Sequence, residues 1–315
     1  MGIAPEKFAF AATGGNSGHL RDAFNRYYGI IFHTTSDEWM GDQELKAEFT
    51  RHGMYAWETV EGMDVNVMSN DTTLDLDTDE SYTLTIQAPR AKIEANSVYG
   101  AMHGLESFSQ LVERGSLVNG TVITDKPRYA FRAVMIDTAR HFYHKEVIFQ
   151  HLDAMAYAKM NVLHWHLVDS DAFPFQSTTF PMMSQTGAYS PNHVYTHHDV
   201  KEVINYAGAR GIRVLPEFDT PGHVLKGWES TGLLTDCYAA DGTTKTGTGP
   251  LNPTLNETYT YLASFYAEIH KLFPDKFVHV GGDEVPAACW QSNPQVTKWM
   301  KEQDPVRQQR FPELF

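Results

Sequence analysis

Two adjacent carboxylic acids, Asp283 and Glu284, follow a pair of glycines at the end of an apolar run. Neighbouring side chains of a regular strand point to opposite faces, so both acids reach one substrate only where the chain leaves strand geometry. Gly281 and Gly282 make that departure easy, because glycine has no Cβ to clash. Two carboxyl groups this close cannot both ionise freely, and we expect the pKa of at least one to rise. A protonated acid beside a charged one suits general acid catalysis on a glycosidic bond.

The elements that must position these acids are predicted from the alternation of apolar runs and helical stripes. Strands are predicted at residues 133–137, 161–168, 212–218 and 277–281, and helices at 145–159, 199–210, 256–273 and 293–301. Strands and helices that alternate at this spacing indicate parallel βαβ units and an α/β fold. Two long loops are predicted, at residues 170–196 and 225–253.

Polar residues collect at the carboxyl ends of all four predicted strands. Asp137 ends the first strand, and Arg140 lies just beyond it. The second strand ends in His-Trp-His-Leu-Val-Asp at residues 164–169, and the third in Glu-Phe-Asp-Thr-Pro-Gly-His at residues 217–223. The fourth strand ends at the two acids. In a (β/α) barrel the active site lies at this end of the strands, so the clustering indicates an active site more strongly than any single motif does.

Each of these features also has another interpretation. The two acids could be a solvated pair at a strand end, and Arg132 could be a surface ion-pair residue. His164 and His166 share one strand face and could be buried histidines with satisfied hydrogen bonds. A His-x-His pair also holds zinc in some hydrolases, with Asp169 and His223 as further ligands here. A zinc site would leave the two acids without a role.

Residues 1–127 follow a different pattern and are predicted to form a separate domain. Residues 65–68 and 82–86 have the alternation of strands, and residues 96–113 carry a helical apolar stripe. Lys126 and Pro127 are typical of a boundary. We therefore predict a small α+β domain at residues 1–127 and a domain of βα units at residues 128–315.

The composition excludes several kinds of partner. The chain of 315 residues carries a formal net charge of −14, which argues against nucleic acid or an anionic membrane surface as the partner. No apolar run approaches the roughly 18 residues of a membrane span. No GxSxG, Walker A or GxGxxG sequence occurs, so acyl transfer and nucleotide binding have no support.

Three glycosylation sequons and two cysteines bear on the compartment. The sequons begin at Asn70, Asn119 and Asn256, and such triplets matter only in the secretory pathway. Cys237 and Cys289 are too few for a disulfide-built scaffold, and they form either one bridge or two free thiols. The N-terminus has neither the basic start nor the apolar core of a signal peptide. The sequence is therefore typical of a secretory-pathway protein without its leader.

Four motifs in this order resemble glycoside hydrolase family 20, the β-N-acetylhexosaminidases, and especially the lysosomal and secreted animal type. They are the run at residues 132–142, the two strand-end sequences quoted above, and His-Val-Gly-Gly-Asp-Glu at residues 279–284. The resemblance extends into the N-terminal domain at residues 99–110 and runs to about residue 299. It implies a (β/α)8 TIM barrel that removes terminal β-linked N-acetylglucosamine or N-acetylgalactosamine from the non-reducing end of a glycan.

The resemblance also implies a retaining, substrate-assisted mechanism, in which the sugar's acetamide oxygen attacks C1 and forms an oxazolinium ion. Glu284 resembles the general acid/base, and Asp283 resembles the residue that holds the acetamide N–H. Asp169 and His223 resemble a relay that contacts Glu284 and tunes its proton affinity. Arg132 resembles the residue that grips sugar hydroxyls through its forked donors.

Further properties follow from the same resemblance. Cys237 and Cys289 match positions that form a disulfide in animal members. The resemblance implies neither a cofactor nor a metal. It implies a lysosomal or secreted enzyme whose substrate is a glycan with a terminal N-acetylhexosamine, and we expect a homo- or hetero-oligomer.

The sequence accounts for only the first four of eight βα units, because a complete barrel takes about 250 residues. The sugar-contacting residues of the later strands have no counterpart, and the segment after about residue 300 no longer resembles the family. We therefore expect exposed strand edges. We also expect weak or no hydrolysis unless a second chain completes the barrel. The alternative function is that of a non-catalytic carbohydrate-binding or subunit-modulating fragment of the same family.

Overall fold

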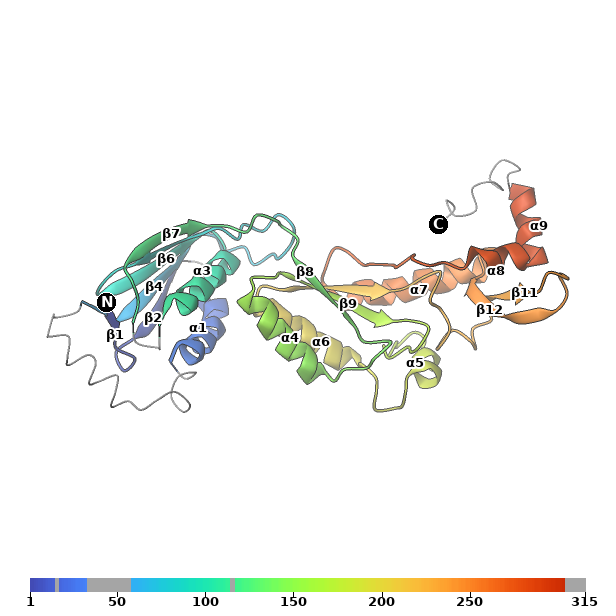
Figure 1. Ribbon diagram of the computed structural model, residues 1–315, viewed down its shortest axis with the longest axis horizontal. Coiled ribbons are helices and arrows are strands. Elements are labelled where there is room, and N and C mark those ends of the chain that lie inside the picture. The colour runs from blue at the N-terminus through green and yellow to red at the C-terminus, as the bar shows by residue number, and fades with distance from the viewer. Residues whose placement is uncertain (15–16, 33–57, 114–116, 304–315) are drawn as a thin grey trace. The chain divides into compact units, whose positions relative to one another are not determined.

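The computed structural model describes residues 1–14, 17–32, 58–113 and 117–303 (Figure 1). The chain divides into two compact units. The first comprises residues 1–132, 153–161 and 208–212, and the second comprises the rest of the chain. The segment after residue 303, part of the tail that was expected to depart from the family pattern, lies outside the described residues.

The first unit is built on a five-stranded mixed sheet in the order β2-β4-β6-β5-β7. Its strands are β2 (Ala9–Gly14), β4 (Gly62–Val67), β5 (Tyr82–Ile86), β6 (Arg90–Ala95) and β7 (Thr121–Asp125), and its helices are α1 (Ser17–Phe32) and α3 (Val98–Leu111). The two helices contact each other and lie on one face of the sheet (Figure 1). Strands β1 (Gly2–Ile3) and β3 (Thr59–Val60) form a separate parallel pair.

Local sequence explains where these elements form. In β5 the alternate side chains of Tyr82, Leu84 and Ile86 are buried, as the period of a half-buried strand requires. Helix α3 begins where the Ser97 side chain accepts a hydrogen bond from the Gly100 N–H, which satisfies a free donor of the first turn. The predicted strand at residues 82–86 and the predicted helix within residues 96–113 are confirmed.

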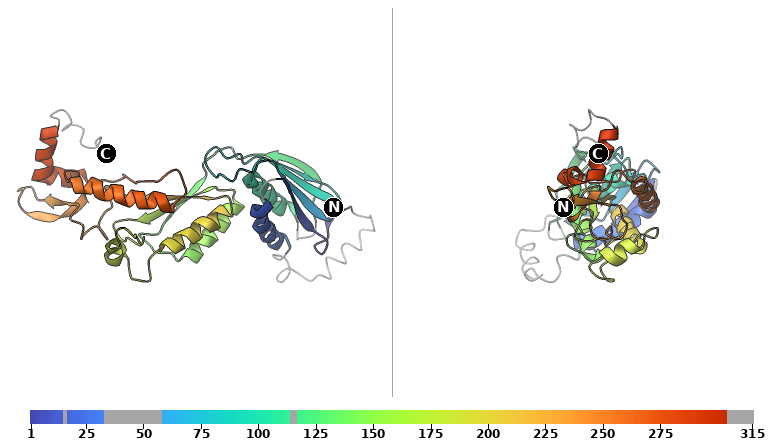
Figure 2. Two further views of the ribbon diagram at one scale, coloured as in Figure 1. Left: turned by 180° about the vertical axis from the view of Figure 1, so that it is seen from behind. Right: turned by 90° about the vertical axis from the view of Figure 1, so that its right-hand side faces the viewer.

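The second unit holds a parallel three-stranded sheet in the order β8-β9-β10. The elements that lie wholly or mostly in this unit are β8 (Ala133–Asp137), α4 (Lys145–Tyr157), β9 (Val162–Val168), α5 (Met182–Gly187), α6 (His197–Gly208), β10 (Arg213–Phe218), β11 (Leu234–Tyr238), β12 (Lys245–Leu251), α7 (Asn256–Leu272), α8 (Ala287–Ser292) and α9 (Pro294–Gln303). Helices α4 and α6 lie side by side, and the rings of Phe149 and Tyr206 stack between them (Figure 2). Each strand leads through a helix to its parallel neighbour, so the predicted α/β fold is confirmed.

The fourth predicted strand, residues 277–281, is not formed. His279 makes an isolated parallel bridge with Glu217 of β10, and the residues around it are irregular. The His279 N–H donates to the Pro216 carbonyl, so residue 216 faces this segment. Proline has no N–H to return, and the ladder therefore lacks a hydrogen bond at this point. The chain follows β10 without becoming a regular strand.

The predicted long loops contain structure that the sequence did not indicate. Residues 225–253 hold the antiparallel hairpin of β11 and β12, and residues 170–196 hold the short helix α5. Strand β12 reads Lys-Thr-Gly-Thr-Gly-Pro-Leu, and its glycines and proline are typical of a loop. The helix predicted at 293–301 corresponds to α9, and α8 precedes it as a separate short helix.

An aromatic core fixes the carboxyl ends of the strands in the second unit. Phe175 from the long loop, Phe218 from the end of β10 and Phe265 from α7 are buried against one another. The ring centroids of Phe175 and Phe218 are 5.0 Å apart, and those of Phe218 and Phe265 are 5.2 Å apart, both edge to face. Edge-to-face pairs of this kind add to the stability gained from burial. The residues that follow β10 are thus held by a rigid base.

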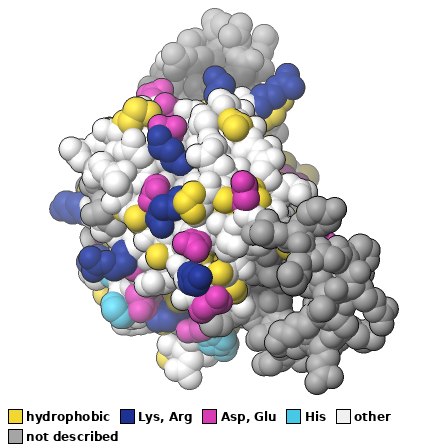
Figure 3. Space-filling view, turned by 90° about the vertical axis from the view of Figure 1, so that its left-hand side faces the viewer, with side chains coloured by type: hydrophobic (Ala, Val, Ile, Leu, Met, Phe, Trp, Pro, Cys, Tyr) yellow, Lys and Arg dark blue, Asp and Glu magenta, His cyan; other side chains and the backbone are white. Residues whose placement is uncertain are grey.

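The surface charges and the helix lengths relate to two partners that the composition argued against, nucleic acid and membranes. On the face shown in Figure 3, Lys and Arg side chains are interspersed with Asp and Glu rather than gathered in a basic patch. Such a mixture offers no electrostatic footprint for a nucleic acid on that face. Among the described residues, no helix is both long enough and apolar enough to cross a membrane.

Candidate active site

The carboxyl ends of the parallel strands bring two buried acids together. Asp169 follows β9 and Asp219 follows β10, and each side chain is only 1% exposed. Potential ligand atoms of His166, Asp169 and Asp219 lie within 4.8 Å of one another. Buried carboxylates this close require positive partners or protons, and the surrounding residues supply them.

His223 lies between the buried acids and the solvent. Its Nδ1 is 2.6 Å from Asp219 Oδ2 and 4.0 Å from Asp169 Oδ2. Burial lowers the pKa of His223, but the hydrogen bond to Asp219 and the charges of Asp169, Asp219 and Asp283 outweigh burial. The pKa of His223 therefore lies above its ordinary value, and the ring carries a positive charge over a wider pH range than a free histidine.

The two buried acids have pKa values shifted in opposite directions. Burial raises the pKa of Asp219 above its ordinary value, although the His223 ring and the Gly282 N–H both donate to its carboxylate. Burial also acts on Asp169, but hydrogen bonds from His166 and the Ser170 N–H, together with the charge of Arg140, lower its pKa. Asp169 therefore stays ionised, while Asp219 holds a proton more readily.

The turn before the two exposed acids uses left-handed backbone. Gly281 and Gly282 have φ angles of +72° and +108°, and Glu284 has a φ of +48°. The Gly282 N–H donates to Asp219 Oδ1 at 3.1 Å, which ties the turn to the end of β10. A non-glycine residue at positive φ is uncommon and persists only where its surroundings hold it. The predicted departure from strand geometry is confirmed.

This turn places both Asp283 and Glu284 beside His223. Glu284 Oε2 is 3.4 Å from His223 Nε2, and Asp283 Oδ2 is 3.9 Å from His223 Nδ1. The side chains of Glu284 and Asp283 are 82% and 65% exposed, in contrast to the buried pair behind the histidine. The site therefore presents two accessible carboxylates beside an imidazole ring, and the buried carboxylates hold that ring in place. The accessible carboxylates can exchange protons with a bound substrate.

A third buried carboxylate, that of Glu217, binds three histidines. Its oxygens contact His164 Nε2, His166 Nδ1 at 3.0 Å and His279 Nδ1 at 3.1 Å. Despite burial, these three rings lower the pKa of Glu217 below its ordinary range. Burial likewise opposes the charge on His166, but its hydrogen bonds to Asp169 and Glu217 raise its pKa to about 10. His164 and His166 are thus buried or half-buried histidines with satisfied hydrogen bonds.

The four zinc ligands that the sequence suggested do not gather in one group. Among the described residues, His164 lies with Glu217 and His279, His166 lies with Asp169, and His223 lies with Asp283. Each group has three potential ligand atoms within 4.8 Å and could hold a metal ion. His164 and His223 fall in different groups, so the alternative zinc site with four ligands gains no support from this arrangement.

The structure does not bring Arg132 to this site. Arg132 precedes β8, so it lies at the opposite end of that strand from Asp137, and it belongs to the first unit. Its guanidinium donates to both carboxylate oxygens of buried Glu80, at 2.9 and 2.7 Å, and to the carbonyls of Tyr129 and Lys159. These contacts use most of its five N–H donors. The predicted sugar-binding role of Arg132 therefore lacks both the position and the free donors.

Arg140 lies at the site in its place. Its guanidinium contacts Asp137 Oδ2 at 2.6 Å and Asp169 Oδ2 at 2.9 Å, and its side chain is 46% exposed. The Asp137 side chain also accepts hydrogen bonds from the Ala139 and Arg140 N–H groups, which fixes the turn after β8. Arg140 and Asp219 both follow predicted strands, but neither was a predicted site residue. Their position just after a strand was the available signal.

The two cysteines and the three sequons fall where their predicted roles allow. Cys237 in β11 and Cys289 in α8 form a disulfide, so the predicted bridge is confirmed. Their separation of 52 residues encloses α7 and the acid-bearing turn. Asn70, Asn119 and Asn256 are all exposed, as acceptors of a glycan must be.

The fold and the site define a class: an α/β protein with carboxylates and histidines at the carboxyl ends of parallel strands. Residues 129–315 match the family model for the catalytic domain of glycosyl hydrolase family 20, and residues 3–111 match a domain described as beta-acetyl hexosaminidase like. The chain belongs to glycosyl hydrolase family 20, as its motifs predicted.

Curated relatives and solved structures agree with this membership. The chain is 45% identical to beta-hexosaminidase subunit beta of Homo sapiens over 95% of this chain and 54% of that protein. It is 42% identical to beta-hexosaminidase subunit alpha of Rattus norvegicus, over 95% of this chain and 57% of that protein. A chitobiase structure from Flavobacterium johnsoniae matches with a TM-score of 0.78 at 26% identity, over 96% of this chain and 45% of that chain. The chain spans about half the length of the curated relatives it matches.

Proposed function

We propose that this chain carries the acid pair of a β-N-acetylhexosaminidase that removes terminal N-acetylglucosamine or N-acetylgalactosamine from the non-reducing end of a glycan. The observation that carries the proposal is the placement of Asp283 and Glu284, both accessible, beside one histidine that two buried carboxylates orient. The names of the relatives, beta-hexosaminidase subunits, support the same substrate class.

In the proposed mechanism the substrate supplies its own nucleophile. The acetamide oxygen of the sugar bonds to C1 while Glu284 gives its proton to the leaving oxygen, and the bond between C1 and that oxygen breaks. Asp283 accepts a hydrogen bond from the acetamide N–H and stabilises the positive charge of the oxazolinium ion. Water then attacks C1, Glu284 takes the proton of that water, and the acetamide re-forms with retained configuration.

The residues behind the pair tune this proton transfer. His223 lies 3.4 Å from Glu284 and has a raised pKa, so a positive ring stabilises the Glu284 carboxylate after it has given up its proton. Asp169 and Asp219 hold the ring in place from the buried side. We assign to Arg140 the binding of sugar hydroxyls that was first predicted for Arg132, because the Arg140 guanidinium is half exposed and can donate several hydrogen bonds.

We further propose that β8, β9, β10 and the segment at residues 277–281 are the first four strands of a (β/α)8 barrel. Consecutive strands that are parallel neighbours, with helices between them, support this architecture. We keep the domain boundary after residue 127 as a prediction. Association with a second copy or a related subunit also stays a prediction, whose test is the size of the protein in solution.

We infer a lysosomal or secreted location from two features. The Cys237–Cys289 disulfide persists in oxidising compartments, and the three exposed sequons are substrates of the secretory pathway alone. Detection of a glycan on Asn70, Asn119 or Asn256 by mass spectrometry of protein made in animal cells would support this location.

Release of 4-nitrophenol from 4-nitrophenyl N-acetyl-β-glucosaminide, across acidic to neutral pH, tests the proposed activity. Glu284→Gln keeps the shape of the side chain and removes its proton, so we expect turnover to fall by about 10²–10⁴-fold. Binding of N-acetylglucosamine should change little. Glu302→Gln, an exposed change in α9, is the matched control and should leave turnover unchanged.

The outcomes separate the two functions. Equal turnover in the original protein and in Glu284→Gln would contradict the assigned role of Glu284. Sugar binding without turnover by a folded sample would favour the non-catalytic carbohydrate-binding alternative. Size-exclusion chromatography of the same sample shows whether any turnover belongs to a monomer or to an assembly.

A further inference from the structure

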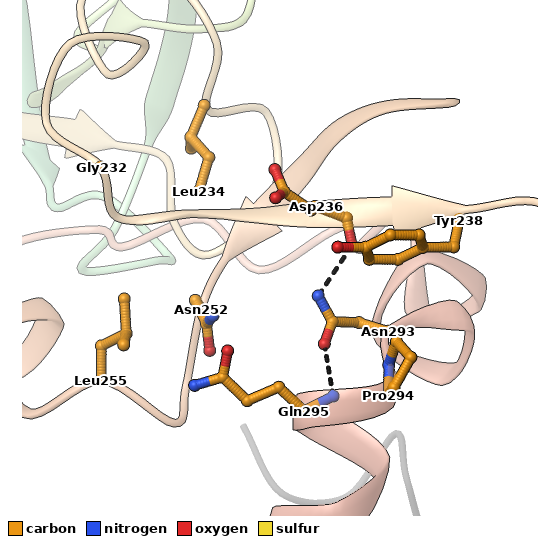
Figure 4. A pocket seen from close by; sticks show the side chains of 9 residues that line it. All are labelled: Gly232, Leu234, Asp236, Tyr238, Asn252, Leu255, Asn293, Pro294 and Gln295. Carbon is orange, nitrogen blue, oxygen red and sulfur yellow. Dashed lines mark hydrogen bonds between the residues drawn. The ribbon is translucent and has the colours of Figure 1, made fainter. Parts of the chain in front are cut away.

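The second unit contains a cavity that shares no lining residue with the candidate active site. Its volume is about 460 Å³, and it lies between the β11–β12 hairpin, the residues before α7 and the start of α9 (Figure 4). This volume falls within the range of about 300–1,000 Å³ that is typical of small-molecule sites. The active-site turn at residues 281–284 contributes nothing to its walls.

Uncharged polar groups with spare hydrogen-bonding capacity line this cavity. Tyr238 is half-buried and Gln295 is exposed, so the hydroxyl and the side-chain amide of these lining residues are accessible to a ligand. Asn252 is 6% exposed, and its Oδ1 accepts hydrogen bonds from the Thr254 N–H and hydroxyl, which leaves its Nδ2 for a ligand. In Figure 4 the amides of Asn252 and Gln295 point toward one another across the cavity.

The walls are held in place by contacts of their own. Asn293 is buried, and its Nδ2 donates to the Asp236 carbonyl at 2.9 Å while its Oδ1 accepts from the Gln295 N–H at 2.8 Å (Figure 4). The Cys237–Cys289 disulfide joins the hairpin to α8, directly before α9. A site whose walls do not need to be ordered on binding loses less free energy when a ligand enters.

The charge and polarity of the lining select the ligand class. No Lys, Arg or His is among the lining residues, so an anion finds no partner. The one carboxylate, that of Asp236, is paired with Lys245 at 2.5 Å, so a cation finds a neutralised wall. Leu234 and Leu255 supply apolar contact. Amides, a phenol and apolar side chains together suit a ligand with both hydroxyl groups and C–H faces.

We propose that this cavity is a second glycan-binding site, which takes a neutral sugar residue. Its hydroxyl groups would bond to the amides of Asn252 and Gln295 and to the Tyr238 hydroxyl, and its C–H face would contact Leu234 and Leu255. This second site is separate from the proposed hydrolysis. Only the choice of N-acetylglucosamine as the probe rests on that proposed function. Such a site would hold a glycan chain by a residue other than the one that is cleaved.

The test uses the full chain with the Glu284→Gln change, made without glycans so that no sugar on Asn256 fills the cavity beside Leu255. N-acetylglucosamine is titrated while the side-chain amide signals of Asn252 and Asn293 are followed by NMR. We expect saturable shifts of both signals. Tyr238→Phe combined with Gln295→Ala should weaken the apparent affinity at these signals at least ten-fold. Gln291→Ala, an exposed glutamine in α8 outside the cavity, is the matched control and should leave the affinity unchanged.

Three further outcomes test this proposal, and the last two keep it separate from the proposed hydrolysis. N-acetylglucosamine 6-phosphate should bind the cavity at least ten-fold more weakly than N-acetylglucosamine, because the lining offers no positive charge. Shifts confined to residues 281–284 in a folded sample would overturn the second site and leave the hydrolysis untouched. Shifts of the cavity signals in a protein without any turnover would support the second site alone.

Discussion

Glu80 in the first unit and Asp169 in the second are both buried and are surrounded by the same kinds of residue, yet only the residues around Asp169 reach the solvent. Glu80 is bound by Arg132 at 2.7 Å and by His103 at 2.9 Å. Asp169 is bound by Arg140 at 2.9 Å and by His166 at 3.0 Å. In both clusters burial opposes the charge of the acid, and in both the bound cations and hydrogen bonds lower its pKa.

The difference lies in what the partners of each acid do with their remaining donors. Arg132 spends its other N–H groups on the backbone carbonyls of Tyr129 and Lys159 and is nearly buried. Arg140 stays half exposed, and His223, 4.0 Å from Asp169, leads outward to Glu284. A closed cluster can only stabilise the fold, whereas an open one can also bind and transfer protons. Residue types alone do not distinguish the two.

The largest effect is expected when the closed cluster of Glu80, Arg132 and His103 is broken. Arg132→Met leaves the Glu80 carboxylate buried without its main positive partner, so we expect the free energy of unfolding to fall by about 3–5 kcal/mol. Urea denaturation followed by circular dichroism measures the change. The affinity of the folded protein for N-acetylglucosamine should stay the same, and a loss of affinity with full stability would restore the sugar-binding role of Arg132.

The matching change in the open cluster of Asp169, Arg140, His166 and His223 should affect sugar binding more than stability. Arg140→Met removes a half-exposed side chain, and His166 and His223 remain near the buried Asp169 carboxylate, so we expect a smaller loss of stability than in Arg132→Met, of about 1–2 kcal/mol. The affinity for N-acetylglucosamine, measured by calorimetry, should fall about 10–100-fold, as expected for one or two lost hydrogen bonds of about 1.4 kcal/mol each. Unchanged affinity would show that sugar hydroxyls do not contact Arg140.

A smaller effect is expected from Asp219→Asn, which keeps the shape of the side chain and removes its charge. The pKa of His223 should fall toward its ordinary value of about 6.5, because its hydrogen-bonded carboxylate is lost. A raised histidine pKa stabilises the fold fully below about pH 6.5 and ceases to do so as the pH rises through the folded-state value. The variant should therefore lose less stability than the original protein as the pH rises above 6.5. NMR titration of the His223 ring, with urea denaturation at several pH values, measures both.

The smallest effect is expected from Asp283→Asn. The carboxylate is 65% exposed and 3.9 Å from His223, so solvent screens its charge. The pKa of His223 should fall in the same direction as in Asp219→Asn, but by less, in the same NMR titration. The free energy of unfolding should stay within about 0.5 kcal/mol of the original. If the pKa of His223 changed more in Asp283→Asn than in Asp219→Asn, the expectation that the buried carboxylate affects His223 more strongly than the exposed one would be wrong.

Much of the second unit was predictable from sequence, because its strands are short apolar runs that end in polar residues. The predicted strand at residues 133–137 is β8, and the predicted helices near 145–159 and 256–273 end within two residues of α4 and α7. The turn after Gly281 was predictable as well, since two adjacent acids on a regular strand cannot face one substrate. In both cases a local rule is sufficient, and the rest of the fold does not override it.

The errors arose where a partner distant in sequence decides the outcome. The segment at residues 277–281 has strand composition, but Pro216 of the neighbouring strand removes a ladder hydrogen bond. Arg132 was given a role at the active site although it precedes its strand, and its true partner, Glu80, lies in another part of the chain. Asp219 gained no role because its importance comes from the contacts with His223 and the Gly282 N–H, which the sequence does not display.

The close approach of Asp219 to Gly281 has a consequence for the tolerance of this chain to genetic change. A Cβ atom added at residue 281 would lie 1.7 Å from Asp219 Oδ1 and 2.9 Å from its Cα, and the glycine already has a φ of +72°. Residue 281 carries no functional group and takes no part in proton transfer. In a screen of all single substitutions, residue 281 should nevertheless tolerate change as poorly as the acids themselves. Positions that tolerate no substitution would therefore include residues that only support the site as well as residues that react.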